Sequence, residues 1–347
     1  MTQTGPDGTA GGSSANDQPT AHARGGDGSA TAGPVLARFA RPRSATSTTV
    51  AVVADAHVST DREGTWKMFH RTRDRLRTAF ADASDRGADA VVLAGDLTKD
   101  GATRDFETVD AILADADAPT LAVPGNHDVP KAFDEHEVPP TSTFAANYAD
   151  GGLPFHAEVG GVDVLGIDSA STPDGTLADT HDGAVSADQL SWLDETLPET
   201  DAPVVVMHHN LPGLIRGDSH SRRSSYPVRD ADTVVETFAR HDAPLVVSGH
   251  LHLPAVSEVA GVRQVVSPPL CSFPQAYLLL EVGPDGTTVR HVPVADPAGV
   301  EEAYLHAKDD SARSDALAEL ALDRLANLPL VDERSPANGD GYRQPID

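Results

Sequence analysis

The sequence predicts an α/β fold with a mixed, two-sheet core, and two observations support this expectation. In the first half of the chain, short apolar runs rich in valine and alanine alternate with segments of helical periodicity. In the second half, apolar runs are more closely spaced, and Gly160-Gly161 separates two of them as in a hairpin. A βαβαβ order implies a parallel sheet covered by helices, whereas hairpins imply antiparallel strands, so we expect both kinds of pairing.

The first half supplies the parallel strands and their crossover helices. Three apolar runs are expected to be strands: residues 48–54, 90–94 and 119–123. Two amphipathic segments are expected to be the helices between them: residues 66–86 and 104–116. In the first of these helices, Phe69, Leu76, Phe80 and Ala83 recur on one face, which indicates that this face is buried.

The second half contains the remaining elements of both sheets. Seven segments are expected strands: residues 158–159, 162–167, 203–207, 244–248, 262–266, 277–282 and 287–292. Three segments are expected helices: residues 186–197, 230–241 and 315–326. Ser186 precedes the first of these helices and is a suitable N-cap.

Both ends of the chain have a different composition from its centre. Residues 1–45 are rich in Gly, Ser, Thr, Ala and Asp without periodicity, and residues 329–347 are similar. Such segments bury too little apolar surface to fold alone, so we expect an N-terminal tail (1–45) and a flexible C-terminal tail (329–347). One domain is expected between them, at residues 46–328.

The charge balance is strongly acidic. The 347 residues carry a formal net charge of −27, with only 4 lysines against 22 arginines. An acidic surface repels nucleic acid and anionic membranes, so nucleic acid is a less favoured partner. The Asp-rich, Lys-poor composition is also typical of halophilic proteins, and molar salt would screen this repulsion. The charge therefore leaves a nucleic-acid substrate open.

Cysteine content and hydropathy limit the class of protein further. The single cysteine, Cys271, allows neither an internal disulfide nor a thiolate metal cluster. No apolar run is long enough to span a membrane, and the first residues lack the apolar core of a secretion signal. We therefore expect a cytoplasmic protein with no membrane partner. Nothing in the sequence predicts an oligomeric state.

Polar motifs follow five of the expected strands. They are Asp55-Ala-His57, Gly95-Asp96, Gly125-Asn-His-Asp128, His208-His209 and Gly249-His-Leu-His252. In open α/β sheets, functional groups gather at the carboxyl ends of strands. Alternate residues of a strand share a side, so Asp55 with His57, and His250 with His252, could point at one centre. Any one motif alone could be an ordinary turn, but five converging motifs favour a functional site.

The donors in these motifs suit a pair of metal ions. Seven side chains could be ligands: Asp55, His57, Asp96, Asn126, His208, His250 and His252. Carboxylates with imidazoles suit borderline metals such as Mn²⁺, Zn²⁺ or Fe better than Ca²⁺ or Mg²⁺. Seven ligands exceed the needs of one ion, whereas two ions sharing a carboxylate would use them all. Two-metal sites activate water for attack at phosphorus.

The ordered series D-x-H, G-D, G-N-H-D, H and G-H-x-H, over residues 55–252, resembles the calcineurin-like metallophosphoesterase superfamily. The segment GAVSADQLSWLDETL adds a similarity to the cyclic-nucleotide phosphodiesterase branch. The resemblance implies a four-layer α/β/β/α sandwich with two mixed sheets. It also implies a metallophosphoesterase domain at 46–328, which hydrolyses a small-molecule phosphoester with a dinuclear centre and a bridging hydroxide.

The resemblance also implies roles for single residues. Asp55, His57, Asp96 and His252 would bind the first metal, and Asp96 would bridge to the second. The second metal would also take Asn126, His208 and His250. Asn126 and His127 would be catalytic, since His127 would lie over the phosphate as general acid or as a donor to developing charge. Asp128 would orient the turn or cap backbone amides.

One position departs from the family pattern. Many members have G-D-x-x-D, in which the later aspartate supports the catalytic histidine, whereas Lys99 stands there in this chain. Asp100 is one residue further on. Either Asp100 takes over through a different turn, or His127 is held in another way.

A basic loop follows His208-His209. Arg216, Arg222 and Arg223 lie in it, and arginine forks match phosphate oxygens, so these residues are candidates for substrate binding. His209 is a further candidate for substrate binding. Adjacent strand residues face opposite ways, so only one of His208 and His209 can easily reach the metals, and His209 is the less favoured alternative ligand. The other interpretation of the loop is a solvated segment whose arginines pair with nearby acids.

The sequence thus predicts a metal-dependent phosphoester hydrolase, first a 3',5'-cyclic-nucleotide or related phosphodiesterase. A broad phosphomonoesterase and a nuclease of the same fold are the alternatives within the enzyme class. A metal-binding scaffold without catalysis is the non-enzyme alternative. A dinucleotide-binding module is excluded because no G-x-G-x-x-G follows the first strand.

Overall fold

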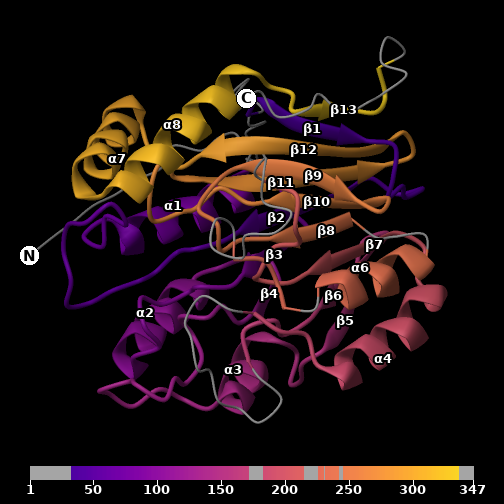
Figure 1. Cartoon of the computed structure of the whole chain (residues 1–347), viewed down its shortest axis with the longest axis horizontal. Helices are drawn as coiled ribbons and strands as arrows, with labels where there is room; N and C mark the ends of the chain where they lie inside the picture. The colour runs from indigo at the N-terminus through magenta and orange to yellow at the C-terminus, as the bar shows by residue number, and fades with distance from the viewer. Residues whose placement is uncertain (1–32, 172–182, 215–225, 230, 242–244, 336–347) are drawn as a thin grey trace, which may run out of the picture. The chain divides into compact units, whose positions relative to one another are not determined.

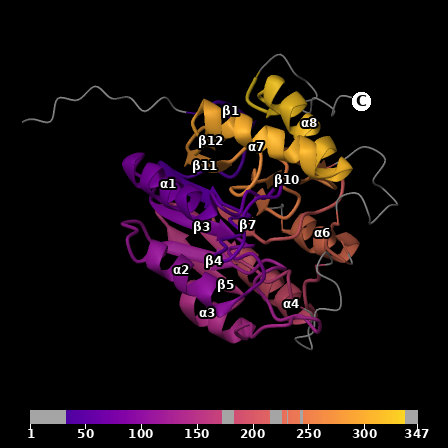
Figure 2. The same cartoon turned by 90° about the vertical axis from the view of Figure 1, so that its left-hand side faces the viewer.

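Two β-sheets packed face to face form the centre of the fold, and helices cover the outer face of each sheet (Figure 1, Figure 2). The computed structural model describes residues 33–171, 183–214, 226–229, 231–241 and 245–335, all within one unit, Ala32–Asp347. The arrangement is a four-layer α/β/β/α sandwich, which confirms the predicted fold class.

The seven-stranded sheet has the strand order β13-β1-β12-β11-β2-β3-β4. Its strands are β1 (Val35–Phe39), β2 (Thr48–Val53), β3 (Ala90–Ala94), β4 (Thr120–Val123), β11 (Ala276–Gly283), β12 (Gly286–Pro293) and β13 (Val331–Asp332). Strands β2, β3 and β4 are adjacent and parallel, so their carboxyl ends lie along one edge.

The six-stranded sheet has the order β5-β6-β7-β8-β10-β9. Its strands are β5 (Phe155–Val159), β6 (Val162–Gly166), β7 (Pro203–Val206), β8 (Leu245–Ser248), β9 (Ala255–Val259) and β10 (Val262–Val266). Strands β6, β7, β8 and β10 are adjacent and parallel. At the two edges of the sheet, β5 pairs antiparallel with β6, and β9 pairs antiparallel with β10. Both sheets are therefore mixed, as predicted.

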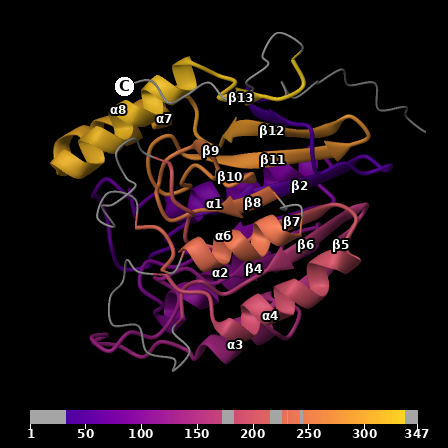
Figure 3. The ribbon, with the colours of Figure 1, turned by 45° about the vertical axis from the view of Figure 1, so that its right-hand side comes forward.

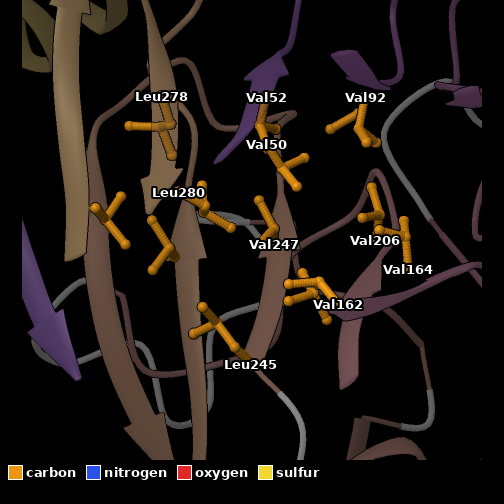
Figure 4. Packing of buried hydrophobic residues seen from close by; sticks show 14 of the residues in the cluster. Val50, Val52, Val92, Val162, Val164, Val206, Leu245, Val247, Leu278 and Leu280 are labelled. Atoms are coloured by element: carbon orange, nitrogen blue, oxygen red, sulfur yellow. The ribbon is translucent and has the colours of Figure 1, made fainter. Parts of the chain in front are cut away.

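Alternation along the strands divides the apolar side chains between two faces. Val50 and Val52 of β2 point into the layer between the sheets, where they face Val247 and other residues of the six-stranded sheet (Figure 4). Ala51 and Val53 point the other way and pack under helices. A strand buried on both faces accounts for the continuous apolar run in the sequence.

Three helices cover the seven-stranded sheet, namely α1 (Thr72–Asp85), α2 (Thr103–Leu113) and α3 (Thr141–Tyr148). On the other side lie α4 (Ala187–Thr196), the 3₁₀ turn η1 (Leu197–Glu199) and α6 (Ala231–Arg240) (Figure 3). The side chain of Ser186 accepts a hydrogen bond from the Gln189 N–H, which confirms the predicted N-cap.

A helical pair, α7 (Pro297–Asp310) and α8 (Ala312–Ala326), packs beside the loops that follow the six-stranded sheet. Its small residues Ala303, Ala318 and Ala321 share an apolar cluster with Leu251 and Met68. Of this pair, the sequence predicts only α8. It also does not predict helix α3 or strand β9. No helix in the described ranges has both the length and the apolar character that crossing a membrane requires.

Both terminal tails are shorter than the sequence predicts. Strand β1 lies inside the expected N-terminal tail, and it pairs with β12 and with β13, which lies inside the expected C-terminal tail. Leu36, Ala37 and Phe39 are buried. Each strand is a short apolar segment in a polar region, and pairing between residues nearly 300 positions apart stabilises it. The folded region thus extends beyond 46–328 at both ends.

The predicted helix at 66–86 begins six residues late. Residues 66–71 form turns, with Met68 at a φ of 43°, and helix α1 starts at Thr72. Met68 is fully buried in the cluster with Leu251 and α8. Tertiary packing of this turn therefore overrides its helical pattern.

Candidate metal centre

The five strand-end motifs meet at one place between the two sheets. Three motifs follow the adjacent parallel strands β2, β3 and β4, and two follow the adjacent parallel strands β7 and β8. Loops hold them together through backbone bonds: the Asp55 N–H donates to the Gly95 carbonyl, and the Gly249 N–H donates to the His208 carbonyl. The metal-ligand candidates are thus placed by sheet topology.

Left-handed backbone geometry turns the side chains toward a common centre. Five of the seven candidates have φ values between 44° and 68°: Asp55, His57, Asp96, His250 and His252. Non-glycine residues rarely adopt such values, and clusters of them occur at functional sites. The expected i, i+2 relation along a strand is not the cause, because β2 and β8 end before these residues.

Two glycines provide the space for the cluster. A Cβ on Gly125 would lie 2.1 Å from Asp96 Oδ1, and one on Gly249 would lie 2.8 Å from Asp55 Oδ2. Any side chain at either position would push a carboxylate out of place.

The first group of donors comprises Asp55, His57, Asp96 and His252, whose ligand atoms all lie within 4.8 Å of one another. His57 Nε2 is 3.2 Å from His252 Nε2 and 3.3 Å from Asp96 Oδ2. His252 Nε2 is 3.3 Å from Asp55 Oδ1. All four side chains are buried. This is the set that the resemblance assigns to one metal.

The second group is built around the amide of Asn126. Its Oδ1 lies 3.1 Å from His208 Nε2 and 3.0 Å from His250 Nδ1. His208 Nε2 is also 3.4 Å from Asp96 Oδ1. Asp96 therefore presents Oδ2 to the first group and Oδ1 to the second, as a bridging carboxylate would.

The bonding at His208 tests whether a cation fits here. His208 Nδ1 is 2.9 Å from the Ala94 carbonyl oxygen, which can only accept, so Nδ1 carries a hydrogen. Nε2 of the neutral ring is then a lone pair facing two oxygen acceptors. Either a proton on Nε2 or a bound cation at this point would relieve the repulsion among these three acceptors. The donor set thus fits a divalent cation at this point.

The pKa values agree with this electrostatic picture. Burial opposes the ionisation of Asp96, but the adjacent His208 and other histidines outweigh burial and hold its pKa well below the usual range. Burial would lower the pKa of His208, yet Asp96 raises it to about 9. For His57, His250 and His252 burial dominates and lowers the pKa, so these rings are neutral and ready to bind a metal.

Metal loading is expected to release about one proton per chain near pH 7. With a pKa of about 9, His208 of the folded metal-free protein is protonated at pH 7, and an ion on Nε2 must displace that proton. Calorimetric titrations with metal in buffers of different ionisation enthalpy measure this release. The apparent affinity should rise by about tenfold per pH unit between pH 6 and 8. A pH-independent affinity would contradict the assignment of His208.

His127 is held by the main chain of residue 99. Its Nδ1 hydrogen-bonds the Lys99 carbonyl oxygen, and its backbone N–H donates to Asp96 Oδ1 at 2.9 Å. The Asp100 side chain instead pairs with Lys99 and faces His136. At the position where many family members have a supporting aspartate, the backbone carbonyl of Lys99 thus holds the His127 ring instead. Burial, and then the Lys67 charge, lower the pKa of His127 to about 3.

Asp128 fastens two loops to each other. Its Oδ2 accepts from the N–H groups of Leu97 and Gly125, and its Oδ1 accepts from the N–H and hydroxyl of Thr98. Burial, together with the Asp96 charge, raises its pKa to about 6. The carboxylate therefore caps backbone amides, as expected, on both the Asp96 loop and its own.

A cavity of about 220 Å³ opens beside the donor groups. Asp96, Asn126, His127, His250 and His252 contribute to its lining. The rest comes from Leu251 and from three residues that the sequence did not indicate: Trp66, Lys67 and Arg313. Lys67 could have been suspected as one of only 4 lysines, but Arg313 has no local signal.

The expected substrate contacts are less well supported. His209 is fully buried and does not line the cavity; its Nδ1 lies 3.1 Å from Ser169 Oγ. Its ring packs against the ring of His250, with the centroids 4.4 Å apart, so His209 contacts a metal-ligand candidate without lining the cavity. Arg216, Arg222 and Arg223 lie outside the described residues.

Comparison with known proteins agrees with the geometry. Residues 48–254 match the profile of the calcineurin-like phosphoesterases. A probable cyclic nucleotide phosphodiesterase of Synechococcus sp. is 27% identical over 250 residues, which cover 69% of this chain and 89% of that protein. The 3',5'-cyclic adenosine monophosphate phosphodiesterase of Escherichia coli is 25% identical over 240 residues, covering 68% and 78%.

A solved structure shares the fold. A dimetal phosphatase from Danio rerio superposes with a TM-score of 0.57 at 14% identity, over 72% of this chain and 97% of that one. With the profile match spanning more than half of the sequence, the chain belongs to the calcineurin-like phosphoesterase family of phosphoester hydrolases.

Proposed function

We propose that this protein is a dinuclear metal-dependent phosphodiesterase that acts on 3',5'-cyclic nucleotides or related small phosphodiesters. The observation that carries the proposal is the division of the donors into two groups that share Asp96. The similarity to two proteins named as cyclic nucleotide phosphodiesterases supports the choice of substrate.

The geometry supports an assignment of the residues that would hold the ions. Asp55, His57 and His252 would bind one ion, Asn126, His208 and His250 would bind the other, and Asp96 would bind both. The nitrogen-rich donor set favours Mn, Fe or Zn. When bound, such ions supply Lewis acidity at phosphoryl oxygens and lower the pKa of water.

The chain's own groups position the substrate. The cavity beside the donors would receive the phosphate and exclude bulk water from one side. His127 lies at its edge with Nδ1 fixed by the Lys99 carbonyl, so Nε2 is the atom available for proton transfer. An anionic phosphate near the ring would favour its protonated form, and the proton would then pass to the leaving oxygen.

A substrate panel tests the function. Cyclic mononucleotides, bis(p-nitrophenyl) phosphate, phosphomonoesters and single-stranded DNA would be assayed with Mn²⁺ in molar salt, since the acidic, lysine-poor composition is typical of halophilic proteins. We expect the fastest turnover on the diesters. Preference for monoesters or for DNA would support the alternative enzymes, and bound metal without any turnover would support a scaffold.

A further inference from the structure

Among the residues around the cavity, Lys67 and Arg313 are cations that the ligand motifs do not explain. Lys67 lies in the turn before α1, and Arg313 lies in the first turn of α8. Arg313 is also outside residues 48–254, the part of the chain that matches the family profile. We refer to these two residues as the cationic pair.

Lys67 differs from the other lysines of this acidic chain. Lys99 pairs with Asp100, Lys131 Nζ is 3.8 Å from Asp134 Oδ1, and Lys308 Nζ is 2.7 Å from Glu319 Oε1. Lys67 forms no such ion pair with any carboxylate of the described residues. Its Nζ instead lies 3.1 Å from His57 Nε2, at the edge of the donor cluster. The ammonium thus lies beside the donor cluster, near the charges of Asp96 and Asp55, without an ion pair to either carboxylate.

Arg313 occupies a position that a helix does not favour for a cation. The first turn of a helix carries partial positive charge, so an arginine there is destabilising unless something offsets it. Its guanidinium lies 4.9 Å from the Tyr226 ring centroid, and within the described residues it has no acidic partner. Stacking orients the group but leaves its hydrogen-bond donors available for phosphate oxygens.

Packing holds the backbone segments that carry both cations beside the cavity. Met68, next to Lys67, is buried with Leu251 and with Ala318 of α8. Further along α8, the buried Arg324 donates to the Leu214 carbonyl at 2.7 Å and to the Pro254 carbonyl at 3.1 Å. Pro254 lies two residues after His252, so α8 is bound directly to a ligand loop. Arg313 therefore sits on a helix that is anchored to the site.

Resting on the proposed function, we infer that the cationic pair binds the charged oxygens of the substrate phosphate, which makes helix α8 part of the substrate site. A surface with a formal charge of −27 repels an anionic ester, and two local cations would offset this repulsion at the point of entry. The ligand class is a small phosphoester or free phosphate.

The test compares Arg313→Ala, Arg313→Lys and Lys67→Met with the wild-type protein. Arg77→Ala is the matched control, since this exposed arginine on α1 lies away from the cavity. For Arg313→Ala we expect about a tenfold or larger increase in KM for bis(p-nitrophenyl) phosphate and in Kd for inorganic phosphate, because a charge-assisted hydrogen bond is lost. The kcat and the bound metal should change little, and Arg313→Lys should recover part of the affinity.

The two readouts separate this inference from the proposed function. Unchanged KM and phosphate affinity in both Arg313→Ala and Lys67→Met would overturn the inference while leaving hydrolysis intact. Phosphate binding that depends on Arg313 in a protein that hydrolyses no ester would support the inference and refute the function. A lower Tm for Arg313→Ala with wild-type phosphate affinity would show that Arg313 only stacks on Tyr226.

Discussion

Asparagine in place of Asp96 is expected to remove both metal ions and to lower kcat/KM by about 10⁴-fold or more. The two carboxylate oxygens face different donor groups, Oδ2 toward His57 at 3.3 Å and Oδ1 toward His208 at 3.4 Å. The substitution keeps the shape of the side chain but removes its charge and turns an amide N–H₂ toward one group. Metal analysis of the purified variant and its hydrolysis of bis(p-nitrophenyl) phosphate measure the two effects.

The matched control is Asp168→Asn. Asp168 is also a buried aspartate that follows a parallel strand, but its Oδ1 accepts from the N–H groups of Ala170 and Ser171 and it belongs to neither donor group. This variant should keep both ions and its activity. Two equivalents of metal retained by Asp96→Asn, with normal turnover, would refute the shared carboxylate.

The candidate site could be predicted because two regular features of the sequence coincide. Apolar runs with intervening helices locate the parallel strands, and the polar motifs come directly after them. Sheet topology then brings Asp55 and Asp96 together without further information, since β2 and β3 are parallel neighbours. The path of the chain beyond each strand could not be predicted, because it depends on left-handed φ values at residues such as His57 and His250.

The features that escaped prediction depend on contacts between distant segments. Strands β1 and β13 are too short to have a periodicity of their own, and each is stabilised by pairing across most of the chain. The helical spacing of its neighbours predicts a helix at Lys67, whereas burial of Met68 against α8 holds Lys67 in a turn at the cavity. Arg313 reaches the cavity only through the anchoring of α8.

The support of His127 also depends on three-dimensional structure. The sequence shows only that Lys99 stands where a carboxylate is common, and it cannot show that the carbonyl of this same residue turns toward the ring. A neutral carbonyl fixes the tautomer as a carboxylate would, but it stabilises the imidazolium less. His127 should therefore gain its proton mainly when an anionic substrate is bound.

Removing the ring by His127→Ala is expected to leave both metal ions in place and to lower kcat by about 10²–10⁴-fold on cyclic nucleotides. The ring belongs to neither donor group, and its backbone N–H, which donates to Asp96, survives the substitution. An alkoxide leaves poorly without a proton, whereas p-nitrophenolate leaves readily. The loss should therefore be much smaller on bis(p-nitrophenyl) phosphate, measured on the same metal-loaded preparation.

That contrast between leaving groups decides the role of His127. Equal losses on both substrates would point to stabilisation of charge on the phosphoryl oxygens, because that contribution does not depend on the leaving group. Loss of metal together with activity would place the ring among the ligands instead. Nδ1 of His127 is hydrogen-bonded to the Lys99 carbonyl oxygen. Proton donation and charge stabilisation would therefore both be carried out by Nε2, the ring nitrogen that is left to act on the substrate.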